Sequence, residues 1–272
     1  MSAARVLAAQ VLGIGLVGPG LVDWPTAAAV LRGETPYVST PTQLPVPAAL
    51  PPAERRRAGR VVRLALAIGA QAVLDSGLAA SELPGVFASS SGDGDNCHEI
   101  CVALAGEAPA LSPTRFHNSV HNAAAGYWSI AHGCQAPSTA LCAYDASFGA
   151  GLLEALLQLQ AGAEAVLLAA YDVDYPPPLR SQRPIPDAFG IALVLASASQ
   201  SRARTRATLR VALTDAAATR LDELHGGALE GLRKAIPAAR ALPLLGSLAR
   251  GGAQQVMLDY LPEHRLEVDL VA

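Results

Sequence analysis

Residues 133–172 read GCQAPSTALCAYDASFGAGLLEALLQLQAGAEAVLLAAYD, and this stretch decides how the chain folds. The short run Ser138–Ala143 predicts a strand, and the leucine spacing that follows predicts a helix over Ala146–Ala161. Gly162 is typical of a helix C-terminus, and the continuously apolar Ala165–Ala170 predicts a strand covered on both faces. This order predicts a parallel, right-handed βαβ unit with a sharp turn before its helix.

The residues around that turn resemble the β-ketoacyl synthases of the thiolase superfamily. These enzymes present a catalytic cysteine at a strand-to-helix turn, in a pattern of the type Gly-Pro-Ser-x-x-x-x-Thr-Ala-Cys. Ala136-Pro137-Ser138 is similar to the start of this pattern, and Gly162–Leu167 is similar to the family's Gly-Asp-Ala-Asp-Val-Met. Counting from either segment places Asp145 in the position of the nucleophilic cysteine.

Further segments extend the resemblance over about residues 5–215. They are similar to the family's opening strand and turn, its third strand and loop, a helix-opening segment and the strand after its gating loop: Val11–Pro19, Gly85–Gly92, Asn118–Gly126 and Phe189–Ala196. The resemblance implies an α/β fold, a single half of a thiolase-like fold, with a mixed, mostly parallel five-stranded sheet flanked by helices. It also implies a β-ketoacyl synthase N-terminal-like domain over 1–215 and a short extension, 216–272, packed on the same domain.

The composition predicts a partner subunit. Charged residues make up 16% of the chain and hydrophobic residues 51%, whereas ordinary soluble domains carry roughly 25% charged residues. We therefore expect a large buried interface. The net charge of −3 gives no reason to expect nucleic acid, and no apolar run reaches the length of about 18 residues of a membrane span. Four cysteines without a secreted pattern predict free thiols in the reducing cytoplasm.

The N-terminal glycines allow two other interpretations. Arg5 followed by Val6–Val17 imitates a signal peptide, but glycines interrupt the helix that such a segment requires. Gly13-Ile-Gly-Leu-Val-Gly18 matches the dinucleotide fingerprint, which needs a helix to start at its glycines. Pro19-Gly20 follow at once, so we expect a first strand and a turn, and no cofactor.

Two polar clusters also carry alternatives. Glu54–Arg63 contains five arginines and opens a helix expected to run to about Leu74. The arginines are either a solvated helix face or a docking patch for an acidic acyl carrier protein. Cys97-His-Glu-Ile-Cys101 has the spacing of metal ligands on a helix, but it lacks a second clustered pair. We expect a partly buried helix with two inert thiols, and no metal.

The later part of the chain carries weaker patterns. Residues 173–186 contain five prolines and predict a loop. Gly190–Ala198 and Ala207–Thr214 predict an antiparallel hairpin at the sheet edge. Beyond Asp215 the expected elements are a helix, followed by two segments that are short strands or helix: Leu221–Ile236, Gln254–Leu261 and Arg265–Val271.

By the resemblance, a set of residues lines or supports the approach to the turn: Asn118, His121, Asn122, Asp145, Phe148 and Phe189. The polar members of segment 118–122 are alternatively caps of a helix over Ala123–His132. The family's equivalent of the strand before the turn pairs with the partner subunit. This implies interface residues in the same strand: Ser138, Thr139, Ala140, Leu141 and Cys142.

The turn itself predicts lost covalent chemistry. A cysteine at a helix N-terminus is stabilised as the thiolate that forms an acyl thioester, whereas a carboxylate there is a poor nucleophile. Asp145 is instead expected to cap the helix. Cys142, three residues upstream, is a weaker alternative nucleophile. In the family a second half supplies two histidines, one in a His-Gly-Thr-Gly-Thr motif, and His225-Gly226-Gly227 lacks its threonines.

Three hypotheses follow. The first is a chain-length-factor-like pseudoenzyme, not catalytic by itself, that pairs as a heterodimer with a full-length β-ketoacyl-ACP synthase in fatty acid or polyketide biosynthesis, including the aryl polyene systems. The second is an acyl-thioester decarboxylase or hydrolase that uses Asp145 as acid or base. The third is a non-catalytic homodimer that binds acyl carrier protein or a lipid.

Overall fold

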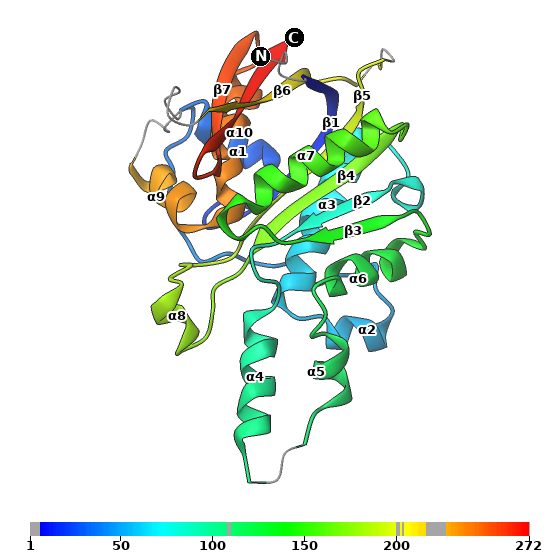
Figure 1. The fold of residues 1–272 in the computed structure, drawn as a ribbon, viewed down its shortest axis with the longest axis vertical. Coiled ribbons are helices and arrows are strands. Elements are labelled where there is room, and N and C mark those ends of the chain that lie inside the picture. The colour runs from blue at the N-terminus through cyan, green and yellow to red at the C-terminus, as the bar shows by residue number, and fades with distance from the viewer. Residues whose placement is uncertain (1–5, 108–109, 200–201, 203, 216–226, 272) are drawn as a thin grey trace.

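The computed structural model describes residues 6–107, 110–199, 202, 204–215 and 227–271 (Figure 1). Its eight-stranded sheet has the order β3-β2-β4-β5-β1-β6-β8-β7. The strands are β1 (Leu7–Val17), β2 (Gly85–Ala88), β3 (Ser138–Leu141), β4 (Ala165–Asp172), β5 (Phe189–Ser197), β6 (Ala207–Asp215), β7 (Gln254–Leu261) and β8 (His264–Val271). β3, β2 and β4 are parallel, and all other neighbours are antiparallel. The α/β class is confirmed, but the sheet is larger and more antiparallel than expected.

The predicted βαβ unit is present. α7 (Ser147–Gln160) connects β3 to β4, and β2 lies between these two strands and is parallel to both. α7 lies close to the sheet, because a Cβ on Gly151 would come within 2.9 Å of the side chains of Ala88 and Leu168. Gly162 follows the helix with a φ of 114°, a conformation that glycine adopts readily.

The N-terminal glycines serve helix packing. They lie in β1, which is buried between β5 and β6 and packs against α3 (Arg60–Ser76). A Cβ on Gly13 would overlap the carbonyl oxygen of Ala72, and one on Gly15 would overlap that of Ile68. No helix starts at these glycines, since α1 (Trp24–Leu31) begins after Asp23. They therefore make room for the helix backbone and do not form a phosphate-binding turn.

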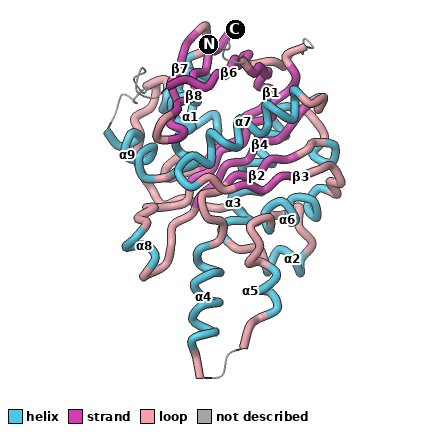
Figure 2. Tube along the Cα trace, in the orientation of Figure 1, coloured by secondary structure: helices cyan, strands magenta, loops and turns pink. Residues whose placement is uncertain are grey.

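Helices cover both faces of the sheet (Figure 2). One core packs α1, α7, α9 (Gly227–Ala235) and α10 (Leu242–Arg250) on one face, and the other packs α3 and α6 (Ala123–His132) on the opposite face. The short elements are α2 (Pro52–Arg57), α8 (Leu179–Gln182), η1 (Ala80–Glu82), η2 (Tyr144–Ala146) and η3 (Pro237–Ala241). In the described part of the chain, no helix combines the length and apolar character needed to cross a bilayer.

Two predictions about elements need correction. The arginine-rich helix is two helices, since the chain leaves helical geometry at Ala58 and Gly59 between α2 and α3. β5 and β6 do not form a hairpin, because β1 lies between them and pairs with both. In the predicted helix Leu221–Ile236, residues 227–235 are helical and 221–226 lie outside the described residues. The two C-terminal segments are strands, and β8 pairs with β6.

α4 (Gly94–Ala105) and α5 (Pro113–His117), which we call the arm, project from the body of the molecule (Figure 1). The helix around Cys97 is only partly buried, because the buried residues of α4 are confined to Gly94 and Asn96. Cys97 and Cys101 are exposed free thiols. The arm also exposes apolar side chains, Phe116 at 68% among them.

Candidate functional site

The turn before α7, residues Ala143–Ala146, is called the elbow here. Tyr144 has a φ of 52°, and it is the one non-glycine residue with a positive φ in the part of the chain that is described. This conformation costs of the order of 1–3 kcal/mol and persists where the surroundings enforce it. Ser147 does so, because its Oγ accepts from the Ala143 amide at 3.1 Å and donates to the Tyr144 carbonyl at 2.7 Å.

Asp145 is held by two arginines. Nη2 of Arg183 donates to Oδ1 at 2.6 Å, and Nη2 of Arg240 donates to Oδ2 at 3.1 Å. The expectation that Asp145 caps α7 is wrong, since no side chain of the described residues forms a cap hydrogen bond with this helix. Charged guanidinium donors form stronger hydrogen bonds with a carboxylate than neutral amides do. Both carboxylate oxygens are therefore engaged, and neither binds the helix N-terminus.

The two arginines come from distant segments. Arg183 lies in the loop between β4 and β5, and its guanidinium carbon lies 3.7 Å from the centroid of the Tyr144 ring. Burial lowers the pKa of Arg183, but the hydrogen bond and charge of Asp145 outweigh it, so the net pKa is raised. Arg240 belongs to η3, near the C-terminus. Asp145 thus joins the elbow to the loop and to η3.

A second carboxylate, Asp172, holds the segment that carries Arg240. It is 2% exposed at the end of β4 and accepts hydrogen bonds from the amides of Ser90 and Ala238, both at 2.8 Å, and from Ser89 Oγ at 3.4 Å. Burial raises its pKa to about 6, and the amide of Ser90 partly opposes this shift. Ala238 lies in η3, so Asp172 positions the segment that carries Arg240.

Asp172 was not among the residues predicted for the site. The sequence did contain a signal, because Asp172 is an acid at the end of an otherwise apolar, buried strand. A buried carboxylate needs hydrogen-bond partners. The partners themselves are 82 and 66 residues away in the sequence, so the strand pattern alone could not name them.

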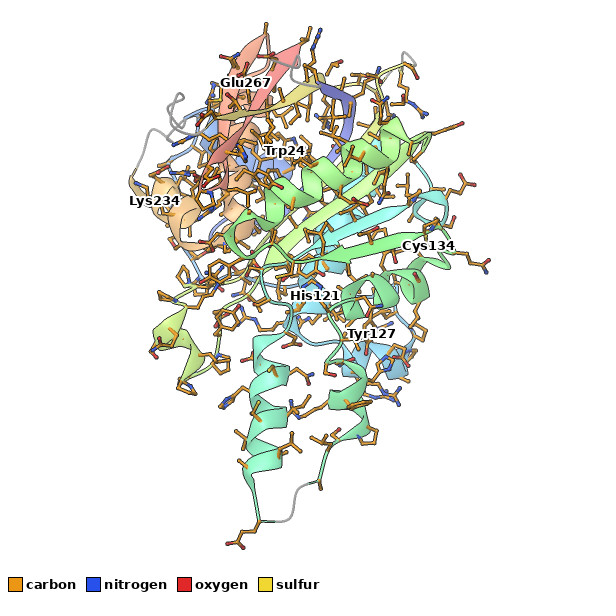
Figure 3. All side chains as sticks on the ribbon, viewed as in Figure 1. Trp24, His121, Tyr127, Cys134, Lys234 and Glu267 are labelled. Carbon is orange, nitrogen blue, oxygen red and sulfur yellow. The ribbon has the colours of Figure 1, made fainter. Side chains whose placement is uncertain are left out.

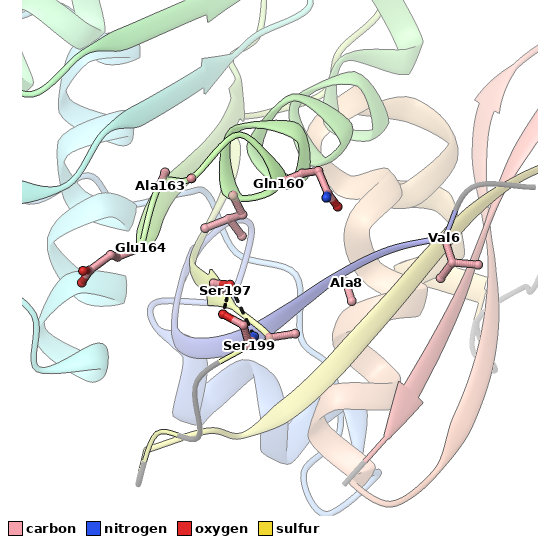
Figure 4. Close-up of a pocket in the computed structure, with 10 residues that line it drawn as sticks. Val6, Ala8, Gln160, Ala163, Glu164, Ser197 and Ser199 are labelled. Atoms are coloured by element: carbon pink, nitrogen blue, oxygen red, sulfur yellow. Dashed lines mark hydrogen bonds between the residues drawn. The ribbon is translucent and has the colours of Figure 1, made fainter.

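A pocket of about 460 Å³ opens beside Asp145. The elbow forms one wall, and Arg240 and the β7–β8 turn form the other, with lining residues that include Asp259, Tyr260, His264 and Arg265. His264 was not predicted, since it follows from the C-terminal strands folding back over the elbow. A second pocket of about 470 Å³ lies by Gln160, at the opposite end of α7 (Figure 4), where Ser197 and Ser199 share a hydrogen bond of 2.9 Å.

The other predicted pocket residues lie elsewhere. Asn118 is buried, donates to the Arg57 carbonyl at 2.9 Å and accepts from the Tyr127 hydroxyl at 3.1 Å. His121 Nε2 lies 3.3 Å from the Ser89 carbonyl oxygen, and Figure 3 shows His121 and Tyr127 on the side of the sheet from which the arm projects. The Asn122 side chain makes no cap to α6.

The two aromatic candidates belong to the core. Phe148 is 1% exposed and Phe189 is 0% exposed. Of the residues predicted to surround Asp145, none lines its pocket, and their role beside an acyl chain stays a prediction.

The predicted interface strand forms one edge of the sheet. Among the residues that the structure describes, β3 pairs with β2 alone, and its residues are exposed or half-buried. Cys142, just after the strand, is exposed, and its Sγ lies 2.8 Å from the Ser90 carbonyl oxygen. Main-chain groups on the outer side of β3 are thus free to pair with another strand.

The arginine cluster has a mainly structural role. Arg55 donates to the carbonyls of Ala48 and Leu50, and Arg63 donates to those of Leu44 and Pro45. Arg60 forms ion pairs with Asp174 and Asp187 on the loop that carries Arg183. These contacts fasten the proline-rich segment and the loop after β4, whereas Arg56 remains exposed.

The described residues contain no group of three metal-binding side chains.

Comparison with known proteins identifies the family. The family described as the N-terminal domain of β-ketoacyl synthase matches residues 30–242, which is more than half of the chain. No curated protein sequence matches.

Similar solved structures cover nearly the whole chain. One is a ketosynthase, ApeO, in complex with its chain length factor, ApeC, from Xenorhabdus doucetiae, with 22% identity, a TM-score of 0.71, and coverage of 97% of this chain and 99% of that chain. The ishigamide ketosynthase/chain length factor has 15% identity, a TM-score of 0.74, and coverage of 98% and 100%. A type II polyketide ketosynthase with its acyl carrier protein has 13% identity, a TM-score of 0.77, and the same coverage.

At these identities the structural likeness shows the fold, which is a single thiolase-like half. The family match rests on the sequence, and its range includes both the elbow and Arg240 of η3. The chain is therefore a member of the β-ketoacyl synthase N-terminal domain family.

Proposed function

We propose that this chain is a non-catalytic, chain-length-factor-like subunit that pairs with a complete β-ketoacyl-ACP synthase in fatty acid or polyketide biosynthesis, the aryl polyene branch included. The observation that carries the proposal is that Arg183 and Arg240 hold the carboxylate of Asp145, the residue that the resemblance assigns to the nucleophile position. The subunit completes the partner's interface and helps to shape its acyl tunnel.

The chemistry of the elbow supports the absence of covalent catalysis. A carboxylate whose oxygens both accept hydrogen bonds from guanidinium groups has little free electron density for attack on a thioester. Attack would also give a labile mixed anhydride. Cys142 lies before the elbow, away from the amides of α7, and its Sγ lies 2.8 Å from the backbone carbonyl oxygen of Ser90.

The edge of the sheet supports pairing with another subunit. β3 has one unpaired side, and the two helices that contact it expose apolar side chains, Ile130 of α6 at 48% and Leu157 of α7 at 49%. Burial of such a surface favours association. Similar structures include complexes of a ketosynthase with a chain length factor. We infer the same kind of partner here, with an acyl carrier protein visiting the pair in the cytoplasm, where the free thiols stay reduced.

Co-expression tests the proposal directly. This chain, carrying an affinity tag, is produced with the full-length ketosynthase from its native host, and the purified material is analysed by size-exclusion chromatography with light scattering. We expect a 1:1 heterodimer. Intact-mass measurement after incubation with acyl thioesters should show acylation of the ketosynthase and no adduct on this chain. A stable acyl adduct on this chain, or failure to pair with the ketosynthase, would contradict the proposal.

One observation favours a second candidate, an acyl-thioester hydrolase or decarboxylase. His264 and Asp145 line the same pocket, so an imidazole and a carboxylate face one space. The ion pairs of Asp145 oppose this role, since the carboxylate has to leave two arginines to reach a substrate. Turnover of malonyl or acyl thioesters by the homogeneous chain, lost in both Asp145→Asn and His264→Gln, would establish it in place of the first.

A further inference from the structure

We propose that Tyr144 is the anchor by which the elbow docks on the ketosynthase, with its ring entering an apolar pocket of that subunit. The inference rests on the proposed function and adds the residue that holds the two subunits together. It starts from the exposure of the ring, which is 60% although the ring belongs to an apolar-rich turn beside the buried start of α7.

The backbone presents the ring outward. Tyr144 adopts its left-handed conformation at a cost that a glycine would avoid, and Ser147 holds it there through the carbonyl of Tyr144. Strain of this kind persists where the fold enforces it and is found at binding and catalytic sites. Asp145 and Ser147 account for the turn, but neither requires a large side chain at position 144.

The ring is also fixed before any partner arrives. The guanidinium of Arg183 lies 3.7 Å from the ring centroid, and Asp145 holds the same guanidinium at 2.6 Å. The Arg183 side chain is 19% exposed, so the ring rests on a largely buried side chain. A preorganised side chain loses less entropy on binding, and tyrosine and arginine are enriched among residues that dominate interface energies.

The position of the ring favours a subunit as its occupant. Tyr144 follows the unpaired edge strand β3 by three residues, and the exposed Cys142 lies between them. A free strand edge is satisfied by a strand of another chain, and the ring lies at the end of that edge. In the ketosynthase pattern the residue before the cysteine is alanine, whereas this chain has Tyr144 before Asp145. The ring of Tyr144 is therefore a departure of this chain from the ketosynthase pattern.

Two substitutions separate binding from folding. Tyr144→Gly removes the ring and relieves the left-handed strain, so its melting temperature should be no lower than that of the wild type. Tyr144→Phe keeps the ring without the hydroxyl. The matched control is Leu74→Ala, because Leu74 is 82% exposed on α3, a helix that packs on β1 and β5.

Affinity for the full-length ketosynthase is measured by isothermal titration calorimetry. We expect the dissociation constant to rise at least about tenfold in Tyr144→Gly, and to change less than about threefold in Tyr144→Phe and Leu74→Ala. Equal affinity of Tyr144→Gly and the wild type overturns the inference and leaves the proposed function standing. If the wild type itself does not bind, the proposed function fails. If Tyr144→Gly disrupts only a homodimer, the occupant is a second copy and the inference is overturned.

Discussion

The carboxylate of Asp145 and the guanidinium of Arg183 lie 2.6 Å apart although 38 residues separate them in the sequence. Arg240 reaches the same carboxylate from 95 residues away. The side chain of Asp145 therefore joins the elbow, the loop after β4 and η3. A catalytic nucleophile has to stay free for its substrate, whereas this residue is part of the structural framework.

Asp145→Asn should destabilise the isolated chain by about 1–2 kcal/mol, because two partly buried guanidinium groups lose their counter-charge. The expected loss is below that of a fully buried pair, since the Asp145 side chain is 39% exposed and solvent screens it. Urea denaturation at pH 7 measures the change. The control Glu34→Gln breaks the exposed pair with Arg32 and should leave the midpoint unchanged. An Asp145→Asn variant as stable as the wild type would show that the ion pairs do not hold the elbow.

Asp172 should make stability depend on pH between about 4 and 6. Its folded pKa of about 6 lies above the ordinary value of 3.8, so the protonated form is favoured in the folded state. Its contribution is therefore fully present below pH 3.8 and is lost as the pH rises through 6. The shift corresponds to a loss of about 3 kcal/mol.

The measurement for Asp172 is the difference in unfolding free energy between wild type and Asp172→Asn at pH 4.5 and pH 7. This difference removes the contributions of the other carboxylates. The wild type should lose stability relative to the variant as the pH rises. A difference that is constant with pH would mean that Asp172 titrates as an ordinary carboxyl.

Gly15→Ala should cost about 3 kcal/mol, the upper end for overpacking, because the added Cβ meets the backbone of α3 and not a flexible side chain. Gly126→Ala is the matched control. Gly126 is exposed in α6 with nothing within 4 Å of an added Cβ, so alanine should stabilise the helix by about 0.5–1 kcal/mol. Thermal denaturation of both variants checks the pair, and equal effects would contradict close packing of β1 on α3.

Thiol labelling should separate the four cysteines into three that react rapidly and one that is protected. Cys97, Cys101 and Cys142 are exposed and should react rapidly with a disulfide reagent, while Cys134 is buried and should react only on unfolding. In the complex with the ketosynthase, Cys142 should be protected at least about tenfold, as followed by mass spectrometry of alkylated peptides. If Cys142 reacts at the same rate in the complex and in the free chain, the partner does not cover the end of β3.

The sequence by itself determined the local part of this structure. The leucine spacing of α7, the apolar run of β4 and the small residues of β3 are patterns within a few residues, and each gave the element expected. The assignment of Asp145 to the nucleophile position rests on the same local information, a count along one continuous unit to Gly162, and it stays a prediction. Helix and strand periodicity reports which face of an element is buried, and that information is local.

Only the tertiary structure decided the partners of these elements. The insertion of β1 between β5 and β6, the extension of the sheet by β7 and β8, and the convergence of Arg183 and Arg240 on Asp145 join segments far apart in the chain. The sequence of an apolar strand does not indicate which neighbouring strand it pairs with. The sequence around an arginine likewise does not indicate which carboxylate it contacts. A helix cap and a double ion pair both require a carboxylate at residue 145. Only the folded chain distinguishes these two roles.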